Sequence, residues 1–288
     1  MNLAYRIVRA IARAALPVAT REKLRGLLHR LRLRVAVARF RAYDARHGYG
    51  GQSLVVRIAD PLAQLWYDHD WALGTDLELL RSGGKLRPGA RVFDVGAHQG
   101  VVALMMAGLV GPSGHVIAVD AVPHNVRVAR RNVSANGRPQ IEVLHAAIGD
   151  RDGSVWFSEE WNGWVTAEPG GGVQVESLTI DTLTARYGAP DVLFIDVEGY
   201  EIHALRGAAQ TIAEHQPDVF VEAHVGVGLQ RFGTVEDVLA LLPAGYRVFV
   251  APGEAGEFVP IADGRRLLEA RCRLVALAPH TTEIMPHD

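Results

Sequence analysis

The chain has 288 residues, 49% of them hydrophobic, and a formal net charge of −2, values typical of a globular protein with a sizeable core. A single cysteine, Cys272, excludes an intramolecular disulfide and a zinc site built from several cysteines. No stretch is long and uncharged enough to span a bilayer, and arginines interrupt the apolar runs near the N-terminus, as a cleaved signal peptide would not allow. We therefore expect a cytoplasmic protein.

Residues 1–47 are strongly basic. They contain 12 Lys or Arg against Glu22 and Asp44, a net charge of +10, so the remainder carries −12. From Leu3 to Ala15 apolar residues recur at helical spacing with arginines on another face, and a second basic helix of the same kind follows. This pattern predicts peripheral contact with an anionic membrane surface. A helical arm packed on its own acidic domain, or a dimer contact, stays open.

After a glycine-rich stretch at 47–51, predicted to be a linker, short apolar runs alternate with amphipathic helices. Helices are predicted at 99–109, 123–136, 200–215 and 234–242, and strands at Arg91–Val95, His115–Val119, Ile141–Leu144, Val192–Ile195, Val219–Glu222, Tyr246–Val250 and Cys272–Ala276. This alternation predicts an α/β, Rossmann-like domain over residues 51–288, with a mostly parallel seven-stranded sheet and helices on both faces. Residues 1–50 are predicted to be a separate basic helical extension.

The first predicted strand of this domain ends in Asp94 and enters a glycine turn, Asp94-Val-Gly-Ala-His-Gln-Gly100. Glycine permits a close approach of backbone to ligand, and ligands bind at the carboxyl ends of strands in an open parallel sheet. The spacing is G-x-x-x-G and not the G-x-G-x-x-G of dinucleotide sites. A carboxylate here would repel a pyrophosphate and attract the ammonium and sulfonium of S-adenosylmethionine (SAM). We expect SAM as the cofactor, contacted by Asp94, Gly96, Ala97, His98 and Gly100.

The next two strand ends extend this cofactor site. Asp120 ends the second strand, where an acidic residue can accept both ribose hydroxyls of an adenosine. Ala146 and Ala147 follow the third strand and are small enough to lie beside an adenine, although plain packing is the commoner role of any single alanine. Either acidic residue alone could be a helix cap or a solvent contact. Two acidic strand ends in succession, the first leading into a glycine turn, favour the cofactor.

The stretch from Gly153 to Ser177 breaks the alternation and is predicted to be a hairpin or mobile loop over the catalytic edge of the sheet. It contains Trp161 and Trp164, candidates for binding a substrate because aromatic faces stack on the C–H surfaces of sugars. Packing of these tryptophans beneath the loop is the alternative.

A second acidic group follows the fourth and fifth strands. Asp196 ends the fourth strand, and Glu222 and His224 share one face at the end of the fifth. Methyl transfer to oxygen requires an aligned acceptor and removal of its proton, so these three are the candidate catalytic residues. The same carboxylates could hold a magnesium ion, but nothing in the sequence sets the ligand spacing, so no metal is assigned. For Glu201, an ion pair with a nearby arginine is the simplest interpretation.

From about Gly89 to about His224 the sequence resembles the FkbM-type methyltransferases. The motifs that carry the resemblance are Phe93-Asp-Val-Gly-Ala-His-Gln-Gly100, Ala147-Ile-Gly-Asp150, Ile180-Asp181-Thr-Leu183, Phe194-Ile-Asp-Val-Glu-Gly-Tyr-Glu201, Leu205-Arg-Gly207 and Val221-Glu-Ala-His224. The resemblance implies a class I methyltransferase fold and O-methylation, with sugars of surface glycans or polyketide-type products as acceptors. It implies SAM contacts by Asp94, Gly96 and Asp120, and it places Asp196 and Glu198 at the border of methyl donor and acceptor.

Three residues depart from the family pattern. Asparagine is common in the family where His98 stands, glutamate where Asp120 stands, and lysine where Phe194 stands. The exchange at Asp120 keeps a carboxylate. The absence of the lysine removes a charge beside Asp196, which puts in doubt any mechanism that depends on it.

The features together predict a SAM-dependent O-methyltransferase acting on a sugar hydroxyl of a glycan or glycolipid, with Glu198, Trp161 and Trp164 at the acceptor. O-methylation of a polyketide-type natural product is an alternative, and so is a non-catalytic, membrane-associated module that retains the cofactor pocket. Nucleic acid is not expected as a partner, because the body of the chain is acidic and the sequence has no Pro-Pro loop of the base-methylating enzymes.

Overall fold

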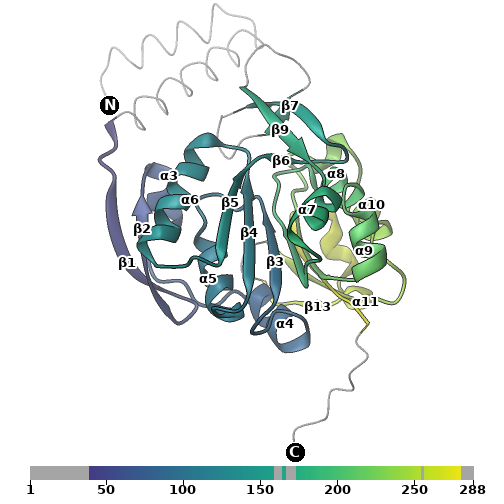
Figure 1. The fold of residues 1–288 in the computed structure, drawn as a ribbon. Helices are drawn as coiled ribbons and strands as arrows, with labels where there is room; N and C mark the ends of the chain where they lie inside the picture. The colour runs from purple at the N-terminus through teal and green to yellow at the C-terminus, as the bar shows by residue number, and fades with distance from the viewer. Residues whose placement is uncertain (1–38, 159–163, 167–172, 254–255, 280–288) are drawn as a thin grey trace, which may run out of the picture. The chain divides into compact units, whose positions relative to one another are not determined.

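The computed structural model describes residues 39–158, 164–166, 173–253 and 256–279 (Figure 1). The two predicted arm helices lie outside these residues. The chain divides into two compact units, one of residues 1–44 and 58–68 and one of residues 45–57 and 69–288. The predicted domain boundary at residue 50 stays a prediction, and the functional residues discussed below all lie in the second unit.

The stretch predicted to be a linker is part of a β-hairpin. Strands β1 (Tyr43–Tyr49) and β2 (Gln52–Ile58) pair with each other and are joined by Gly50 and Gly51, whose φ angles are +57° and +79°. Two successive residues with positive φ suit the tight turn of a hairpin, and glycine adopts them without strain. In the first unit, helix α3 (Pro61–Tyr67) is capped by the side chain of Asp60.

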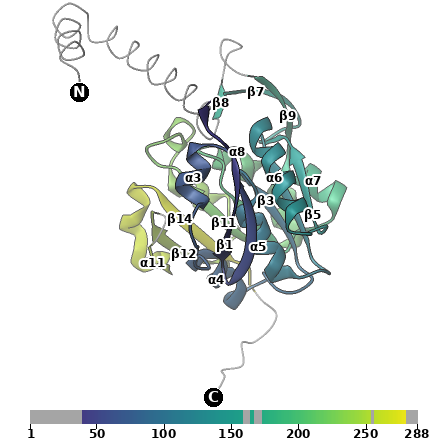
Figure 2. The same ribbon diagram turned by 90° about the vertical axis from the view of Figure 1, so that its left-hand side faces the viewer.

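The second unit is built on an eight-stranded sheet with the order β13-β12-β14-β11-β10-β3-β4-β5. Its strands are β3 (Arg91–Val95), β4 (His115–Asp120), β5 (Ile141–His145), β10 (Val192–Ile195), β11 (Asp218–Ala223), β12 (Arg247–Pro252), β13 (Val259–Pro260) and β14 (Cys272–Leu277). The strands from β11 to β5 are parallel, and β14 runs antiparallel between β11 and β12. In Figure 2, the labels of β12 and β14 lie to the left of β11, and those of β3 and β5 lie to its right. All seven predicted strands are present, and the predicted number is too low by one, because the short strand β13 pairs with β12 at the edge of the sheet. The strand order confirms the class I methyltransferase fold.

Helices cover both faces of this sheet, as predicted (Figure 1). They are α4 (Thr75–Gly83), α5 (Val101–Val110), α6 (Pro123–Ala135), α7 (Ile180–Tyr187), α8 (Glu201–Arg206), α9 (Ala209–His215), α10 (Val235–Ala240) and α11 (Ile261–Gly264), with 3-10 turns at Leu229–Arg231 and Arg265–Glu269. The single helix predicted at 200–215 is wrong, since α8 and α9 are separate. A Cβ atom at Gly207, between them, would lie 2.0 Å from the carbonyl oxygen of Gly149, so the backbone bends around a close contact.

A smaller sheet follows β5 and has the order β6-β9-β7-β8. Its strands are β6 (Ala147–Ile148), β7 (Gly153–Ser158), β8 (Trp164–Thr166) and β9 (Val173–Leu178). The antiparallel pairing of β7 with β8 and β9 gives the predicted hairpin. Because β6 comes directly after β5, this sheet begins at the carboxyl-terminal edge of the main sheet.

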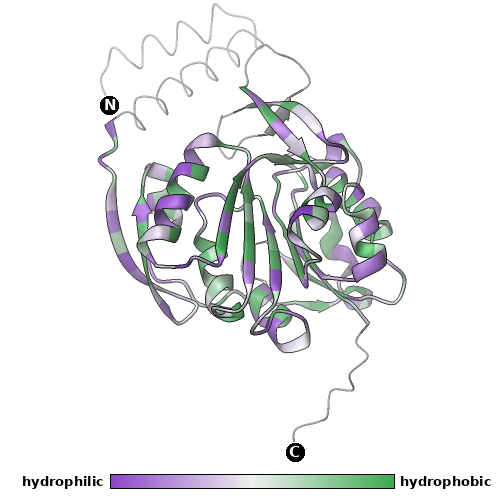
Figure 3. Cartoon of the chain, viewed as in Figure 1, coloured by the Kyte–Doolittle hydropathy of each residue, from purple (hydrophilic) through white to green (hydrophobic). Residues whose placement is uncertain are grey.

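Apolar residues are concentrated in the main sheet (green in Figure 3). Every residue of β10, β11 and β14 is buried, as expected for strands covered on both faces. Among the described helices, none combines the length and apolar character needed to cross a bilayer.

Candidate active site

Four acidic residues stand at the carboxyl-terminal edge of the main sheet. Strands β4, β3, β10 and β11 are parallel neighbours, so their carboxyl ends meet at this edge. Asp94 and Asp120 come from β3 and β4, and we call them the first carboxylate pair. Asp196 follows β10 and Glu222 lies in β11, and with Glu198, Glu201 and His224 they form what we call the histidine cluster.

The glycine turn between β3 and α5 brings these two groups together. Gly96 has a φ of +91°, and a Cβ atom there would lie only 1.8 Å from the carbonyl oxygen of Asp196. Gly100, with a φ of +78°, is the N-cap residue of α5. Position 96 therefore requires glycine for two reasons. Its φ is positive, and the carbonyl oxygen of Asp196 leaves no room for a Cβ atom.

Asp94 is a buried carboxylate that is incompletely bonded. It is 2% exposed, and its Oδ2 atom accepts no hydrogen bond from any described residue. Burial, together with the charge of Asp120, raises the pKa of Asp94 to about 7. A buried acceptor atom of this kind fits a ligand that brings cationic donors, as the ammonium-bearing part of SAM does.

Asp120 is held by the backbone around it. Its Oδ2 accepts from the backbone N–H of His98 at 2.8 Å, and its Oδ1 accepts from that of Val122 at 2.8 Å and from the side chain of Asn125 at 3.3 Å. Burial raises the pKa of Asp120 to about 7 in spite of these donors. The carboxylate is thus oriented toward the glycine turn, where the sequence predicts a ribose.

The three predicted alanine contacts are all buried. Ala97 lies in the glycine turn, and its N–H donates to the carbonyl of Val119. Ala146 packs in the main hydrophobic core, and Ala147 packs in a second cluster with Phe157. Their contact with an adenine stays a prediction.

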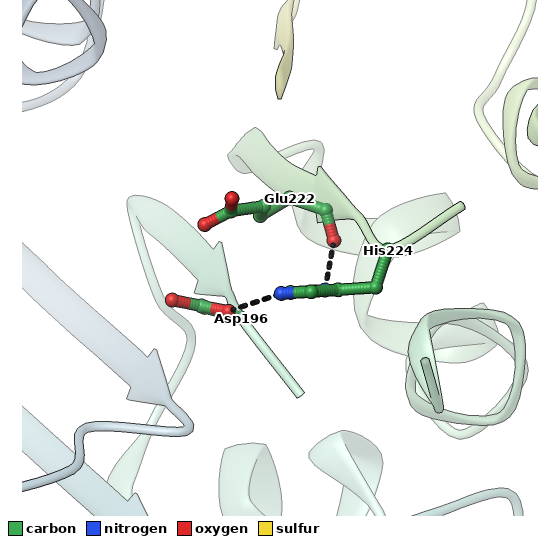
Figure 4. Close-up of side chains that lie close together, drawn as sticks. All are labelled: Asp196, Glu222 and His224. Atoms are coloured by element: carbon green, nitrogen blue, oxygen red, sulfur yellow. Dashed lines mark hydrogen bonds and ion pairs between the residues drawn. The ribbon is translucent and has the colours of Figure 1, made fainter. Parts of the chain in front are cut away.

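His224 lies at the centre of the histidine cluster and is completely buried. Its Nδ1 is 2.7 Å from Oε1 of Glu201 and its Nε2 is 3.5 Å from Oδ1 of Asp196 and 3.4 Å from Oε2 of Glu198. Figure 4 shows Asp196, Glu222 and His224 converging from the ends of two strands. The structure therefore brings together the three residues predicted to be catalytic.

The charged groups of the histidine cluster shift one another's pKa values. Partial burial and the charge of Glu222 raise the pKa of Asp196 well above that of an ordinary aspartate. Burial lowers the pKa of His224, but the hydrogen bond to Glu201 and the charge of Asp196 outweigh it and raise the value to about 9. Glu222 also pairs with Arg271, whose Nε and Nη2 both lie 2.7 Å from its Oε1.

Glu201 has a role in the cluster that the sequence did not reveal. An ion pair with a nearby arginine was the alternative considered for it, but Glu201 is fully buried and accepts from His224 and from the backbone N–H of Gly199 at 2.8 Å. Gly199 has a φ of +100°, and a Cβ atom there would lie 2.5 Å from the Cα of Gly228. The Glu-Gly-x-Glu spacing after β10 was the available signal, because it places an acid at the first residue of the following helix.

The region that contains the site matches a known protein family. The model of the Methyltransferase FkbM domain matches residues 94–248, more than half of the chain, from the first carboxylate pair through the histidine cluster. The chain belongs to the FkbM methyltransferase family. It is thus a member of a family of SAM-dependent methyltransferases, with SAM as the cofactor.

Curated relatives are similar over shorter stretches. A protein-L-isoaspartate O-methyltransferase of Methanothrix thermoacetophila is 41% identical over 75 residues, which cover 26% of this chain and 33% of the relative. An arsenite methyltransferase of Halobacterium salinarum is 37% identical over 94 residues, 30% of this chain and 24% of the relative. The chain thus spans a third or less of the length of these two relatives.

Solved structures are similar to this chain at low sequence identity and with TM-scores below 0.5. The FkbM methyltransferase of Methylobacillus flagellatus has a TM-score of 0.45 and 18% identity, covering 65% of this chain and 43% of that one. Aeropyrum pernix fibrillarin, solved with natively bound SAM, has a TM-score of 0.43 and 12% identity, covering 84% of this chain and 86% of that one.

This FkbM family member replaces a lysine by an aromatic stack. Phe194, at the position where lysine is common in the family, is buried and stacks on Phe220 with ring centroids 3.9 Å apart. It lies in register with Asp94 on the neighbouring strand β3. Phe194 therefore places an apolar ring, and not the positive charge of a lysine, between Asp94 and strand β11.

The predicted acceptor residues are placed only in part. Glu198 lies in the turn after β10 with a φ of +50°, and its side chain is 23% exposed. Trp161 lies outside the described residues, and of Trp164 the description includes only the backbone, at the start of β8.

An aromatic group that the sequence analysis missed lies next to Glu198. Tyr200 stacks on His203 with centroids 4.1 Å apart, and Phe232 meets both rings edge-on. Phe232 is 39% exposed. The contact between Gly199 and Gly228 brings the two loops that carry these aromatic residues together.

Proposed function

We propose that this chain is an O-methyltransferase that methylates a hydroxyl group of a sugar in a glycan or glycolipid. The observation that carries the proposal is a pair of accessible carboxylates, Asp196 and Glu198, backed by the buried pair of Glu201 and His224 beside the glycine turn. This arrangement suits an acceptor that must be oriented and must lose a proton.

The first carboxylate pair and the glycine turn would hold the cofactor. Asp94 offers a buried oxygen to a cationic group, and Asp120 offers its carboxylate to hydroxyls, while Gly96, Ala97, His98 and Gly100 provide the adjoining backbone. When bound, SAM supplies an electrophilic methyl group. The sheet order places the histidine cluster on the neighbouring strands, within reach of an acceptor at the same edge.

The exposed fraction of each side chain in the histidine cluster indicates whether it can contact the acceptor. The side chains of Asp196 and Glu198 are 37% and 23% exposed, so they can contact an acceptor hydroxyl, and its proton passes to this pair. His224 is completely buried and Glu222 is bonded to Arg271, so both act by positioning Asp196.

Charge and aromatic surface favour a neutral sugar. Four carboxylates in the cluster would repel an anionic acceptor, such as the carboxylate of an isoaspartate. The exposed Phe232 and the Tyr200–His203 stack offer aromatic faces close to Glu198. Trp161 and Trp164 stay predicted acceptor contacts on the ground of the sequence alone.

The basic arm supports an acceptor that is presented at a membrane. Residues 1–47 carry a net charge of +10 with apolar residues at helical spacing, which suits peripheral binding to anionic lipids at the inner face of the membrane. Deleting this stretch should abolish binding to anionic liposomes. Undiminished binding after the deletion would contradict this part of the proposal.

The activity is tested with the full-length protein, SAM and a panel of rhamnosides, fucosides and macrolides, with products identified by mass spectrometry and Asp196→Asn as control. We expect methylation of a sugar by the wild type and almost none by the variant. Methylation of macrolides alone would favour a polyketide-type acceptor. SAM binding by calorimetry without turnover on any acceptor would favour a non-catalytic cofactor-binding module.

A further inference from the structure

We propose that Asp196, Glu222 and His224 form a binding site for one divalent metal ion of the Mn²⁺ or Mg²⁺ type, open on the side that faces the acceptor. The role of the ion in orienting an acceptor hydroxyl rests on the proposed function, whereas its binding does not.

The three side chains have the spacing of a metal site. Each offers one ligand atom, and these atoms all lie within 4.8 Å of one another. Around an ion with bonds of about 2.1 Å, ligand atoms are about 3 Å apart when adjacent and about 4.2 Å apart when opposite. Small side-chain rotations would therefore close the three ligands on an ion (Figure 4). The sequence alone could not supply this spacing.

The second, independent observation is the state of His224. Its Nε2 atom is buried, makes no hydrogen bond with any described residue and points toward Asp196 and Glu198. Its Nδ1 atom is bonded to Glu201, which is itself held by the N–H of Gly199. Glu201 holds the Nδ1 proton, so a metal ion would take the place of the Nε2 proton between Asp196 and Glu198, and metal-binding histidines are usually oriented in this way.

The charges around the site also favour a cation. Asp196, Glu198, Glu201 and Glu222 gather around one imidazole, and Arg271 pairs with Glu222. Phe194, two residues before Asp196 in the chain, stacks on Phe220 and brings no positive charge to the site. A divalent ion would compensate carboxylates that repel one another at close range.

The donor set narrows the class of ion. Two carboxylates favour Mg²⁺ or Mn²⁺, and the single imidazole favours a first-row transition metal, so Mn²⁺ suits the mixed set. The exposed part of Asp196 leaves room for an acceptor oxygen as a further ligand. In that arrangement the ion lowers the pKa of the hydroxyl, and the proton passes to Glu198 as the oxygen forms its bond to the methyl carbon and the carbon–sulfur bond breaks.

The test measures Mn²⁺ binding to the chelator-treated, full-length protein by electron paramagnetic resonance, without SAM or acceptor. We expect one Mn²⁺ per chain, and at least tenfold weaker binding by Asp196→Asn and by Glu201→Gln, which removes the partner of Nδ1. Glu176→Gln, at an exposed position of β9, is the matched control and should bind as the wild type does. Thermal unfolding of each variant verifies that it is folded.

Two results would overturn the inference: a free Mn²⁺ signal unchanged by the wild-type protein, or equal affinity in a folded Asp196→Asn variant. Failure of the proposed function looks different. In that case Mn²⁺ binds as expected while no acceptor of the panel is methylated. Conversely, methylation that survives chelation, combined with no Mn²⁺ binding, would remove the metal site and leave the proposed activity standing.

Discussion

The first carboxylate pair and the histidine cluster lie at the same edge of the sheet, but different groups compensate their negative charges. Asp120 is bonded to two backbone N–H groups and an asparagine, and Asp94 has an oxygen without a described donor. The cluster, by contrast, has cationic partners in its own chain, since Glu222 pairs with Arg271 and Glu201 bonds to His224.

This difference indicates what each region requires of its ligand. The pKa values of Asp94 and Asp120 are both raised to about 7, so the pair carries its full negative charge at neutral pH only at an energetic cost. A cationic ligand such as SAM would remove that cost. The cluster is already partly compensated, so its function depends more on geometry. Substitutions confined to one region test whether the two regions work separately.

The largest effect is expected from Asp196→Asn. The change keeps the shape of the side chain but removes a charge that faces the acceptor, so turnover should fall by about 10³-fold, within the range typical of lost proton transfer. SAM affinity should change less than about threefold, because the first carboxylate pair is intact. Steady-state kinetics and calorimetry measure the two quantities. A parallel loss of SAM affinity would show that the regions are not separate.

Asp94→Asn should have the opposite profile. Loss of this charge should weaken SAM binding by about 10- to 100-fold, as expected for a buried charge-assisted contact. The variant without cofactor should be more stable than the wild type at pH 8, because an unfavourable buried charge is gone. Calorimetry and thermal unfolding provide the data. Unchanged affinity for SAM would remove Asp94 from the cofactor site.

Much of this division could be predicted from the sequence. Each strand of the main sheet is a short apolar run, and those that carry the site end in an acid or lead into a glycine turn, so Asp94, Asp120, Asp196 and Glu222 were placed at one edge by the logic of parallel sheets. Local pattern and strand order suffice for such residues, because their position depends on the strand that carries them.

The contacts inside the histidine cluster could not be predicted in this way. Glu201 is on a helix and His224 follows a strand, and their bond depends on how α8 packs on β11. The break between α8 and α9 depends likewise on the contact of Gly207 with the backbone of Gly149. Both are long-range packing effects, which hydrophobic periodicity does not encode.

The pH dependence of SAM binding is the next test of the comparison. Below pH 7 Asp94 and Asp120 become protonated, so SAM affinity should fall by about tenfold or more between pH 8 and pH 5.5. The stability of the protein without cofactor should change in the opposite sense. Since the folded pKa values lie above the ordinary value of 3.8, these two groups contribute stability that is fully present below about pH 4 and is lost as the pH rises from there to about 7.

Thermal unfolding of the wild type and of Asp94→Asn at pH 8 and at pH 5.5 separates the contribution of Asp94 to stability from that of other titrating groups. The advantage of the variant should be larger at pH 8 than at pH 5.5, because unfolded Asp94, with an ordinary pKa of 3.8, is ionised at both pH values, whereas the buried Asp94 of the folded protein is ionised mainly at pH 8. An advantage independent of pH would mean that the charge of Asp94 is not its cause.

The smallest effect is expected from Asp120→Glu, which introduces the residue common in the family. The carboxylate is kept, so SAM affinity should stay within about threefold of the wild type. The extra methylene must fit at a position that is 8% exposed, so the unfolding temperature should fall slightly. Asp120→Asn is the matched control, since it keeps the length and removes the charge. If the glutamate variant loses as much SAM affinity as the asparagine variant, then the hydrogen bonds from His98 and Val122 matter more than the charge of Asp120. In that case the function of the first carboxylate pair depends on geometry as much as that of the histidine cluster does.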